Sequence, residues 1–220
     1  MKILLDTSDV QAIKRIAATF PVWGVTTNPA IVATGRVQLF DLLPAIRDAL
    51  GGKGTLFAQV ISSSVEGMIT DAQKLYERVD NLVVKVPVTP KGLQVIKELS
   101  AQNIPTLATA VYGSAQGLLG ILAGAKYVSP YVSRIDAQGG NGPEVVSELQ
   151  SLLSMHAPES ELIAASFKSP RQALECMLIG CKGITLSPEV FDLFLADPAV
   201  AIAVTQFEEK WKGAFSTDYL

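Results

Sequence analysis

The sequence predicts a single α/β domain with the architecture of a (β/α)8 TIM barrel, followed by one extra C-terminal helix. The chain has 220 residues of which 49% are hydrophobic, enough for one sizeable core. Short apolar runs alternate with longer stretches of helical periodicity, and eight such pairs follow one another. Units averaging roughly 27 residues are compact for this fold, so the loops must be short. A doubly wound sheet is the alternative, but the glycine-rich turn that often follows its first strand is missing.

The predicted strands are apolar on both faces, as expected of strands that helices cover. They are residues 2–6, 23–28, 55–60, 82–87, 105–110, 126–132, 161–167 and 182–186. The predicted helices are residues 8–20, 38–50, 64–78, 90–101, 113–124, 143–156, 170–178 and 188–195. Three of these helices begin with a capping hydroxyl followed by proline: Thr89-Pro90, Ser169-Pro170 and Ser187-Pro188.

One helical segment remains after the eighth unit. We expect one domain over residues 1–220, with the barrel over about 1–196 and the extra helix over about 198–215. This helix carries five large apolar residues at helical spacing: Val200, Val204, Phe207, Trp211 and Phe215. Such a stripe could close the bottom of its own barrel or pack on a neighbouring copy, and the sequence leaves both open.

Composition argues against several classes of protein. A net charge of −3, without a basic stripe, argues against a nucleic-acid partner. Cys176 and Cys181 fit reduced thiols of a cytoplasmic protein, and a single histidine, His156, argues against zinc sites and Ser/His/Asp triads. We expect no metal and no secretion signal. We also expect no membrane span, because the uncharged segment 104–125 contains polar residues and four glycines.

Polar side chains are predicted to gather at one end of the barrel. In this fold, side chains of one parity point inward, and those at the C-terminal strand ends reach the active-site face. Applying that parity gives Leu4-Asp6, Gly24-Thr26-Asn28, Phe57-Gln59, Val83-Lys85, Leu107-Thr109, Ser129-Tyr131 and Ala164-Ser166. The pattern predicts a polar, reactive mouth above a dry core, with Thr26, Leu107 and Ser129 among the candidate substrate contacts.

Lys85 is the most informative of these residues. It lies between apolar neighbours in a strand that should be buried, and burial disfavours its ammonium form. A pKa that falls well below the usual lysine value of about 10.4 would leave enough neutral amine to attack a carbonyl and form a Schiff base. The alternatives are a permanent ion pair with Asp6, or a side chain whose head reaches water.

Two further groups of candidates surround Lys85. Gln59, Thr109 and Tyr131 could together hold one water that shuttles protons beside an imine, or could each be ordinary satisfied polar residues. Arg134, Ser166 and Lys168 offer two cations and a hydroxyl to an anion, and the late loops of this fold often bind phosphate. A solvated surface arginine is the alternative for Arg134.

Glycine runs at 51–54 and 139–142 lack the features of a P-loop and predict turns.

Seven motifs in one order resemble the small transaldolase family over nearly the whole chain. They are DTSDV at 6–10, GVTTNP at 24–29, LFAQV at 56–60, VVKVPVT at 83–89, TAVYGSAQGLL at 109–119, RIDAQGG at 134–140 and AASFKSPRQAL at 164–174. The resemblance implies a metal-independent, cofactor-free Schiff-base aldolase with Lys85 as nucleophile. It further implies that Asp6 and Asn28 contact donor hydroxyls, that Gln59, Thr109 and Tyr131 hold the water, and that Arg134 and Ser166 bind the acceptor phosphate.

The same resemblance favours the aldolase branch of the family. Gln59, Leu107 and Tyr131 are aldolase-like, because transaldolases typically have Glu, Asn and Phe there, whereas Ser129 is similar to transaldolases. Ser133 departs from the Asn of familiar aldolases. The expected reaction is reversible cleavage of fructose 6-phosphate to dihydroxyacetone and glyceraldehyde 3-phosphate, or addition of dihydroxyacetone or small hydroxyketones to aldehydes.

Three rivals to this reaction remain at the level of sequence. One is a transaldolase that moves the same three-carbon unit between sugar phosphates, and another is a non-catalytic barrel that binds a sugar phosphate. A metal-dependent aldolase is the third, and the single histidine argues against it. The resemblance also implies a homo-oligomer that forms a ring, with a decamer as the candidate size, in which the last helix of each copy reaches a neighbour.

Overall fold

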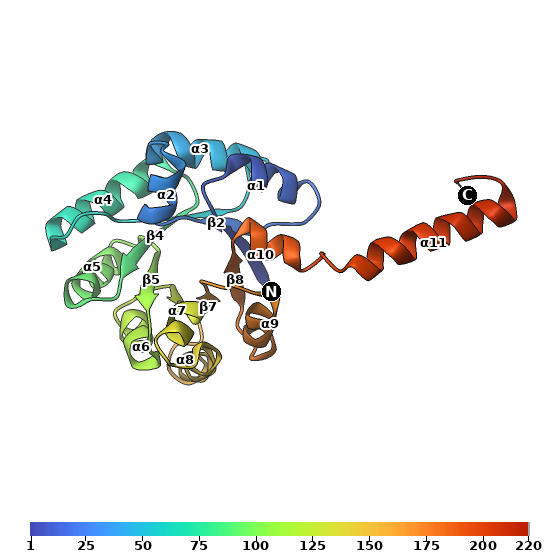
Figure 1. Cartoon of the computed structure of the whole chain (residues 1–220). Coiled ribbons are helices and arrows are strands. Elements are labelled where there is room, and N and C mark those ends of the chain that lie inside the picture. Colours follow the sequence, from blue (N-terminus) through green and yellow to red (C-terminus); the bar gives the residue numbers. More distant parts are fainter. Residues whose placement is uncertain (220) are drawn as a thin grey trace.

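Eight parallel strands close into a barrel in chain order, with β8 pairing back onto β1 (Figure 1). The structure is a computed structural model that describes residues 1–219. Its strands are β1 (Lys2–Asp6), β2 (Gly24–Thr26), β3 (Thr55–Gln59), β4 (Leu82–Pro87), β5 (Thr106–Val111), β6 (Tyr127–Pro130), β7 (Glu161–Ala164) and β8 (Gly183–Leu186). The predicted (β/α)8 barrel is therefore confirmed.

Helices surround the barrel and alternate with its strands (Figure 1). They are α1 (Val10–Ala17), α2 (Pro29–Gly35), α3 (Leu39–Ala49), α4 (Val65–Arg78), α5 (Pro90–Ala101), α6 (Ser114–Leu122), α7 (Val132–Ala137), α8 (Gly142–His156), α9 (Pro170–Leu178), α10 (Pro188–Leu193) and α11 (Pro198–Phe215). The caps predicted at Thr89, Ser169 and Ser187 are confirmed, since each hydroxyl accepts a backbone N–H three residues on.

Two short helices, α2 and α7, were not predicted. Helix α2 begins with the same kind of signal as the others, because Asn28 Oδ1 accepts the N–H groups of Ala30 and Ile31 and Pro29 follows at the first helical position. Helix α7 follows β6 after Tyr131 and begins at Val132, the last residue of the stretch 126–132 that was predicted as strand. Both helices lie at the C-terminal ends of strands, and so both border the mouth of the barrel.

The apolar core has two compartments. The larger lies between the barrel and its helices, and the smaller fills the barrel interior with Leu4, Phe57, Val83, Leu107, Tyr127 and Ile163. Trp23 packs on the interior cluster, with its ring centroid 6.1 Å from that of Phe57. The dry core predicted below the polar strand ends is therefore present.

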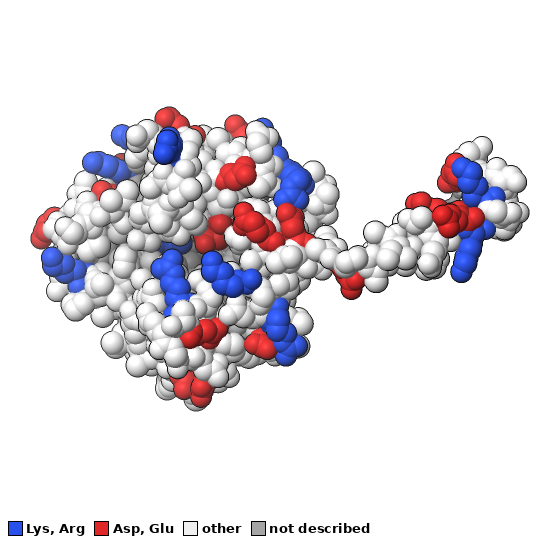
Figure 2. Space-filling view, viewed as in Figure 1, with Lys and Arg blue, Asp and Glu red and all other residues white. Residues whose placement is uncertain are grey.

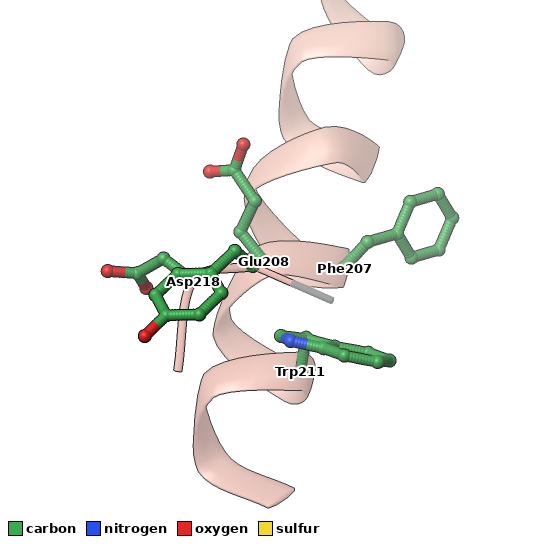
Figure 3. A pocket seen from close by; sticks show the side chains of 5 residues that line it. Phe207, Glu208, Trp211 and Asp218 are labelled. Atoms are coloured by element: carbon green, nitrogen blue, oxygen red, sulfur yellow. The ribbon is translucent and has the colours of Figure 1, made fainter. Parts of the chain in front are cut away.

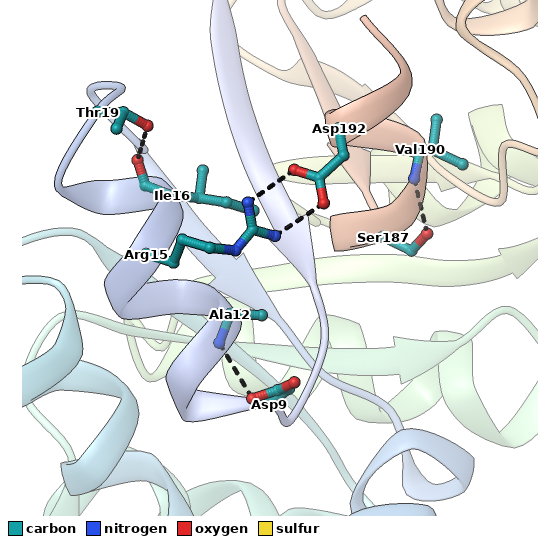
Figure 4. Close-up of polar contacts among 8 residues, drawn as sticks. All are labelled: Asp9, Ala12, Arg15, Ile16, Thr19, Ser187, Val190 and Asp192. Atoms are coloured by element: carbon teal, nitrogen blue, oxygen red, sulfur yellow. Dashed lines mark hydrogen bonds and ion pairs between the residues drawn. The ribbon is translucent and has the colours of Figure 1, made fainter. Parts of the chain in front are cut away.

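The first and last helices of the barrel meet where the sheet closes. Arg15 on α1 donates two hydrogen bonds to the carboxylate of Asp192 on α10, at 2.9 and 2.8 Å (Figure 4). Figure 4 also shows the caps of the two helices, Asp9 on α1 and Ser187 on α10. Because both ion-pair partners are about half exposed, we attribute closure mainly to the β1–β8 ladder and the packed core beneath it.

Helix α11 extends away from the barrel and buries none of its residues (Figure 1). Its exposed apolar residues include Val200, Phe207 and Phe215, each more than half exposed. Near its end, Phe207 and Trp211 border a hollow of about 510 Å³, with Glu208 and Asp218 on the other side (Figure 3). The alternative in which this helix closes the bottom of its own barrel is therefore wrong for this structure.

The outer surface mixes charges of both signs. Figure 2 shows basic and acidic side chains side by side on the face that it presents, without a continuous basic stripe. Among residues 1–219, no helix has the length and hydrophobicity needed to cross a membrane. The uncharged segment 104–125 instead forms β5 and α6.

Candidate active site

A cavity of about 290 Å³ lies at the C-terminal ends of the strands, where active sites of this fold are found. Its wall combines side chains from the ends of several strands and the loops after them: Asp6, Asn28, Ala30, Ile31, Lys85, Tyr131, Arg134, Ala165, Ser166, Phe167, Lys168, Thr185 and Ser187. A larger hollow of about 660 Å³ includes Lys2, Trp23 and Tyr127 near the N-terminal strand ends. The smaller cavity therefore holds most of the residues predicted from the strand ends.

Lys85 projects from the middle of β4 and is only 4% exposed. Its Nζ donates a hydrogen bond of 2.7 Å to the backbone oxygen of Thr27. Burial lowers the pKa of this amine, while the nearby charge of Asp6 partly opposes that effect. Within the described chain, Lys85 forms no ion pair with a carboxylate, so the predicted alternative of a permanent pair with Asp6 is not what the structure has.

Asp6 ends β1 and is held by a chain of two threonine hydroxyls. Thr26, its partner in the β1–β2 register, lies with Oγ1 2.6 Å from Asp6 Oδ1. Thr26 Oγ1 is also 2.7 Å from Oγ1 of Thr185 on β8. Sequence analysis did not identify Thr185, although Gly183-Ile184-Thr185 repeats the Gly-aliphatic-Thr pattern of Gly24-Val25-Thr26.

Two of the three predicted water-holding residues are in contact. The hydroxyls of Thr109 and Tyr131 lie 2.9 Å apart, and burial raises the pKa of the Tyr131 phenol, which keeps it protonated. Gln59 lies beside Lys85 in the β3–β4 register, but it borders a neighbouring groove together with Asn28. Its side chain makes no hydrogen bond within residues 1–219, and so the structure does not join it to the other two.

Of the candidate substrate contacts Asn28, Leu107 and Ser129, one lines the cavity and two do not. Asn28 lines the cavity, but its side-chain oxygen already caps α2, which leaves its NH2 group for a ligand. Leu107 belongs to the apolar cluster inside the barrel, and Ser129 is buried at 3% exposure. Neither Leu107 nor Ser129 is among the residues that line the cavity.

The three candidate anion-binding residues all line the cavity. Arg134 on α7 has its guanidinium carbon 4.8 Å from the Tyr131 ring centroid and donates a long hydrogen bond of 3.5 Å to the Tyr112 hydroxyl. The Ser166 hydroxyl lies 2.8 Å from that of Ser133. Lys168 is exposed in the loop before α9. Tyr112 and Ser133 are therefore supporting residues that sequence analysis did not predict as such.

The parity predicted for β7 is wrong. Ile163 belongs to the barrel interior, whereas Ala164 belongs to the outer core under the helices. Ser166 nevertheless lines the cavity, because its backbone adopts a left-handed conformation with φ 62° that interrupts the alternation of side chains. Tyr131 also lies beyond its strand, where it pairs with Ala165 in an isolated bridge.

Metal-binding side chains do not converge anywhere in residues 1–219: no group of three or more His, Cys, Asp or Glu residues is placed to hold an ion. Both cysteines are buried and unpaired by disulfide. Burial raises the pKa of Cys176 to about 12 and that of Cys181 to about 11. Neither thiol is therefore suited to act as a nucleophile.

Residues 3–219 match the family described as Transaldolase/Fructose-6-phosphate aldolase. The chain belongs to this family. This match confirms the resemblance found in the sequence motifs and identifies the protein as an enzyme of the aldolase/transaldolase type. The description covers both cleavage and transfer, so the choice between the two reactions depends on the residues at the site.

Solved structures similar to this family member share its fold at low sequence identity. A structure described as native KDPGal is 17% identical with a TM-score of 0.52, and the match covers 84% of this chain and 81% of that one. A designed cube-shaped protein cage is 16% identical with a TM-score of 0.55, covering 97% and 77%. A mandelate oxidase variant with a monooxide FMN adduct is 13% identical with a TM-score of 0.58, covering 84% and 63%. At these sequence identities the likenesses show the fold alone.

Proposed function

We propose that this enzyme is a Schiff-base aldolase that reversibly cleaves fructose 6-phosphate to dihydroxyacetone and glyceraldehyde 3-phosphate. In the reverse direction it would add dihydroxyacetone, or a related small hydroxyketone, to an aldehyde. The observation that carries the proposal is Lys85, a buried amine with a lowered pKa and no ion pair among the described residues. It shares one cavity with an acid, Asp6, and a phenol, Tyr131.

The first half of the proposed reaction uses Lys85 and Asp6. The neutral amine attacks the ketone carbon of fructose 6-phosphate, and loss of water gives a protonated imine on Nζ. The bond between C3 and C4 then breaks as the C4 hydroxyl loses its proton, and the electron pair flows into the imine to leave an enamine. Asp6 supplies a carboxylate in the same cavity to accept that proton.

The second half distinguishes an aldolase from a transaldolase. To release dihydroxyacetone, the enamine carbon must take up a proton and water must then hydrolyse the imine, so an oriented water is needed. The contact between the Tyr131 and Thr109 hydroxyls supports this step, because together they can donate to and accept from one water. A phenylalanine at position 131, as in transaldolases, would lack one of these two hydroxyls. The tyrosine of this chain therefore favours the aldolase over the transaldolase.

The proposed phosphate contacts are Arg134, Ser166 and Lys168. They line the same cavity as Lys85, and guanidinium and ammonium groups are the side chains that proteins use to bind phosphate. Arg134 is supported from two sides, by the Tyr131 ring and by the Tyr112 hydroxyl. A sugar phosphate is therefore the substrate class that fits both the amine and the cations of this cavity.

The test is whether cleavage requires an acceptor. We expect the wild type to release glyceraldehyde 3-phosphate from fructose 6-phosphate alone, in an assay that couples the triose phosphate to a dehydrogenase. The double variant Tyr131→Phe with Gln59→Glu should lose cleavage more than it loses transfer to erythrose 4-phosphate. A wild type that releases the triose phosphate only when erythrose 4-phosphate is present would instead make the enzyme a transaldolase.

We also propose a homo-oligomer in which α11 packs on a neighbouring copy. The support is its row of exposed apolar side chains, whose burial is worth about 25 cal/mol for each Å² removed from water. Removing the residues from Pro198 onward should give a smaller species in analytical ultracentrifugation, and replacing Phe207 and Phe215 with serine should act in the same direction. If both altered chains sediment like the parent, apart from the mass removed, this proposal is refuted.

A further inference from the structure

Three strands bring three polar side chains together inside the barrel mouth. β1 lies between β2 and β8 in the sheet, and each of these strands contributes one residue to a row of oxygens. Thr26 Oγ1 lies 2.6 Å from Asp6 Oδ1 and 2.7 Å from Thr185 Oγ1. The two threonines are 1% and 3% exposed. Thr185 thus reaches Asp6 only through Thr26, although it also lines the substrate cavity.

The direction of the hydrogen bonds in this row follows from counting protons. A carboxylate can only accept, so the single hydroxyl proton of Thr26 is donated to Asp6 Oδ1. Thr26 then has no proton left for its second neighbour, and Thr185 must donate its own proton to Thr26 Oγ1. Thr185 is therefore the donor that fixes the hydroxyl of Thr26 in the orientation that Asp6 requires.

We propose that Thr185 is a positioning residue of the reaction, which acts through Thr26 to hold the Asp6 carboxylate in one orientation beside Lys85. The inference rests on the proposed Schiff-base function, in which Asp6 accepts the proton of the C4 hydroxyl of the substrate. With Oδ1 engaged by Thr26, Oδ2 has no hydrogen-bond partner within residues 1–219 and is the oxygen left for a substrate hydroxyl. Hydrogen bonds in such a row strengthen one another, so removing the outer donor weakens the inner bond as well.

Loss of the Thr185 hydroxyl should have two measurable effects. Thr26 would become free to turn its proton away from Asp6, and the carboxylate would spend less time in the reactive orientation. The charge of Asp6 also supports the ammonium form of Lys85. A less well fixed carboxylate should therefore shift the formation of the imine to lower pH, an effect that simple loss of packing would not produce.

The experiment compares three substitutions in the full-length enzyme. Thr185→Val removes the hydroxyl with little change of shape, and we expect kcat for cleavage to fall about tenfold while KM changes less than about twofold. Thr185→Ser restores the hydroxyl and should keep kcat within about threefold of wild type. The control is Thr106→Val, since Thr106 is equally buried on β5 and its hydroxyl has no partner in the described residues.

The second measurement is the pH dependence of trapping with dihydroxyacetone and cyanoborohydride. Its midpoint should move to lower pH in Thr185→Val, whereas Thr185→Ser and Thr106→Val should follow the wild type. If Thr185→Val proves unstable, Thr185→Ala provides a second hydroxyl-free variant with the same expectation.

Each contrary result has a separate meaning. A hydroxyl-free variant with unchanged kcat and unchanged midpoint refutes the role of Thr185, as does a serine variant that is as impaired as the valine variant. If the wild type itself traps no dihydroxyacetone, the proposed Schiff-base function fails instead.

Discussion

Burial of Lys85 should make the stability of the enzyme depend on pH in a way that Lys85→Met removes. The unfolded chain keeps this amine protonated up to about pH 10.4, whereas the folded chain, in which burial lowers its pKa, releases the proton at lower pH. Between these two values the unfolded state binds more protons, so the free energy of unfolding rises with pH. The largest possible slope from one group is about 1.4 kcal/mol per pH unit.

The substitution also has effects that do not depend on pH. Methionine leaves the Thr27 carbonyl without its donor, which costs about 1–3 kcal/mol, but it also removes the cost of burying an amine. These two contributions partly cancel. What remains shifts the free energy of unfolding of the variant by the same amount at every pH. The diagnostic quantity is therefore the change with pH of the difference between wild type and variant.

Urea unfolding between pH 6 and pH 10 measures this difference. We expect the wild type to gain stability relative to Lys85→Met as pH rises through the lowered pKa of Lys85 toward its unfolded value. Lys97→Met, at an exposed position of α5, supplies the baseline for replacing a lysine with methionine. If the difference in free energy of unfolding between wild type and Lys85→Met stays constant over the whole pH range, burial does not disfavour the ammonium form of Lys85 and the argument is refuted.

Three further outcomes follow from the structure. Gly24→Ala should lower the thermal unfolding temperature sharply, because its Cβ would lie 2.2 Å from a backbone oxygen of β3, whereas Gly213→Ala on open α11 should stabilise that helix by about 0.5–1 kcal/mol. Arg134→Gln should raise KM about tenfold or more for glyceraldehyde 3-phosphate but little for glyceraldehyde, and equal effects on both would contradict its phosphate role. A thiol reagent at pH 8 should label Cys176 and Cys181 only after unfolding, since burial raises both pKa values to about 11 or above.

The barrel could be predicted from sequence because its signals are local. Apolar runs mark the strands, and hydroxyl-proline pairs mark the starts of helices such as α5, whose bounds Pro90–Ala101 agree with the predicted range. The strand ends were less predictable. Residues 126–132 are predicted as one strand, but β6 ends at Pro130, and Tyr131 is the residue directly before α7. Where a strand ends depends on pairing with distant neighbours, which the local pattern does not contain.

The site was predictable where side chains alternate regularly and not where the backbone departs from that pattern. Lys85 follows the inward parity of β4. Ser166 reaches the cavity because its backbone is left-handed, a conformation that a serine in the sequence does not predict. Ala110, with φ 55°, similarly lies within the register shift between β5 and β6. The missed Thr185 was detectable, because β2 and β8 share one Gly-aliphatic-Thr pattern. Gln59 ends β3 and Tyr131 follows β6, and parity does not say whether two inward side chains from strands that are not neighbours meet.

The central claim is that Lys85 carries the reacting imine, and intact mass measurement tests it most directly. After incubation with dihydroxyacetone and borohydride, the wild type should gain the mass of one reduced imine per chain. Lys85→Met should gain none, whereas Lys168→Met, which removes the other lysine of the same cavity, should still gain one. Full trapping in Lys85→Met, or none in the wild type, would contradict the account.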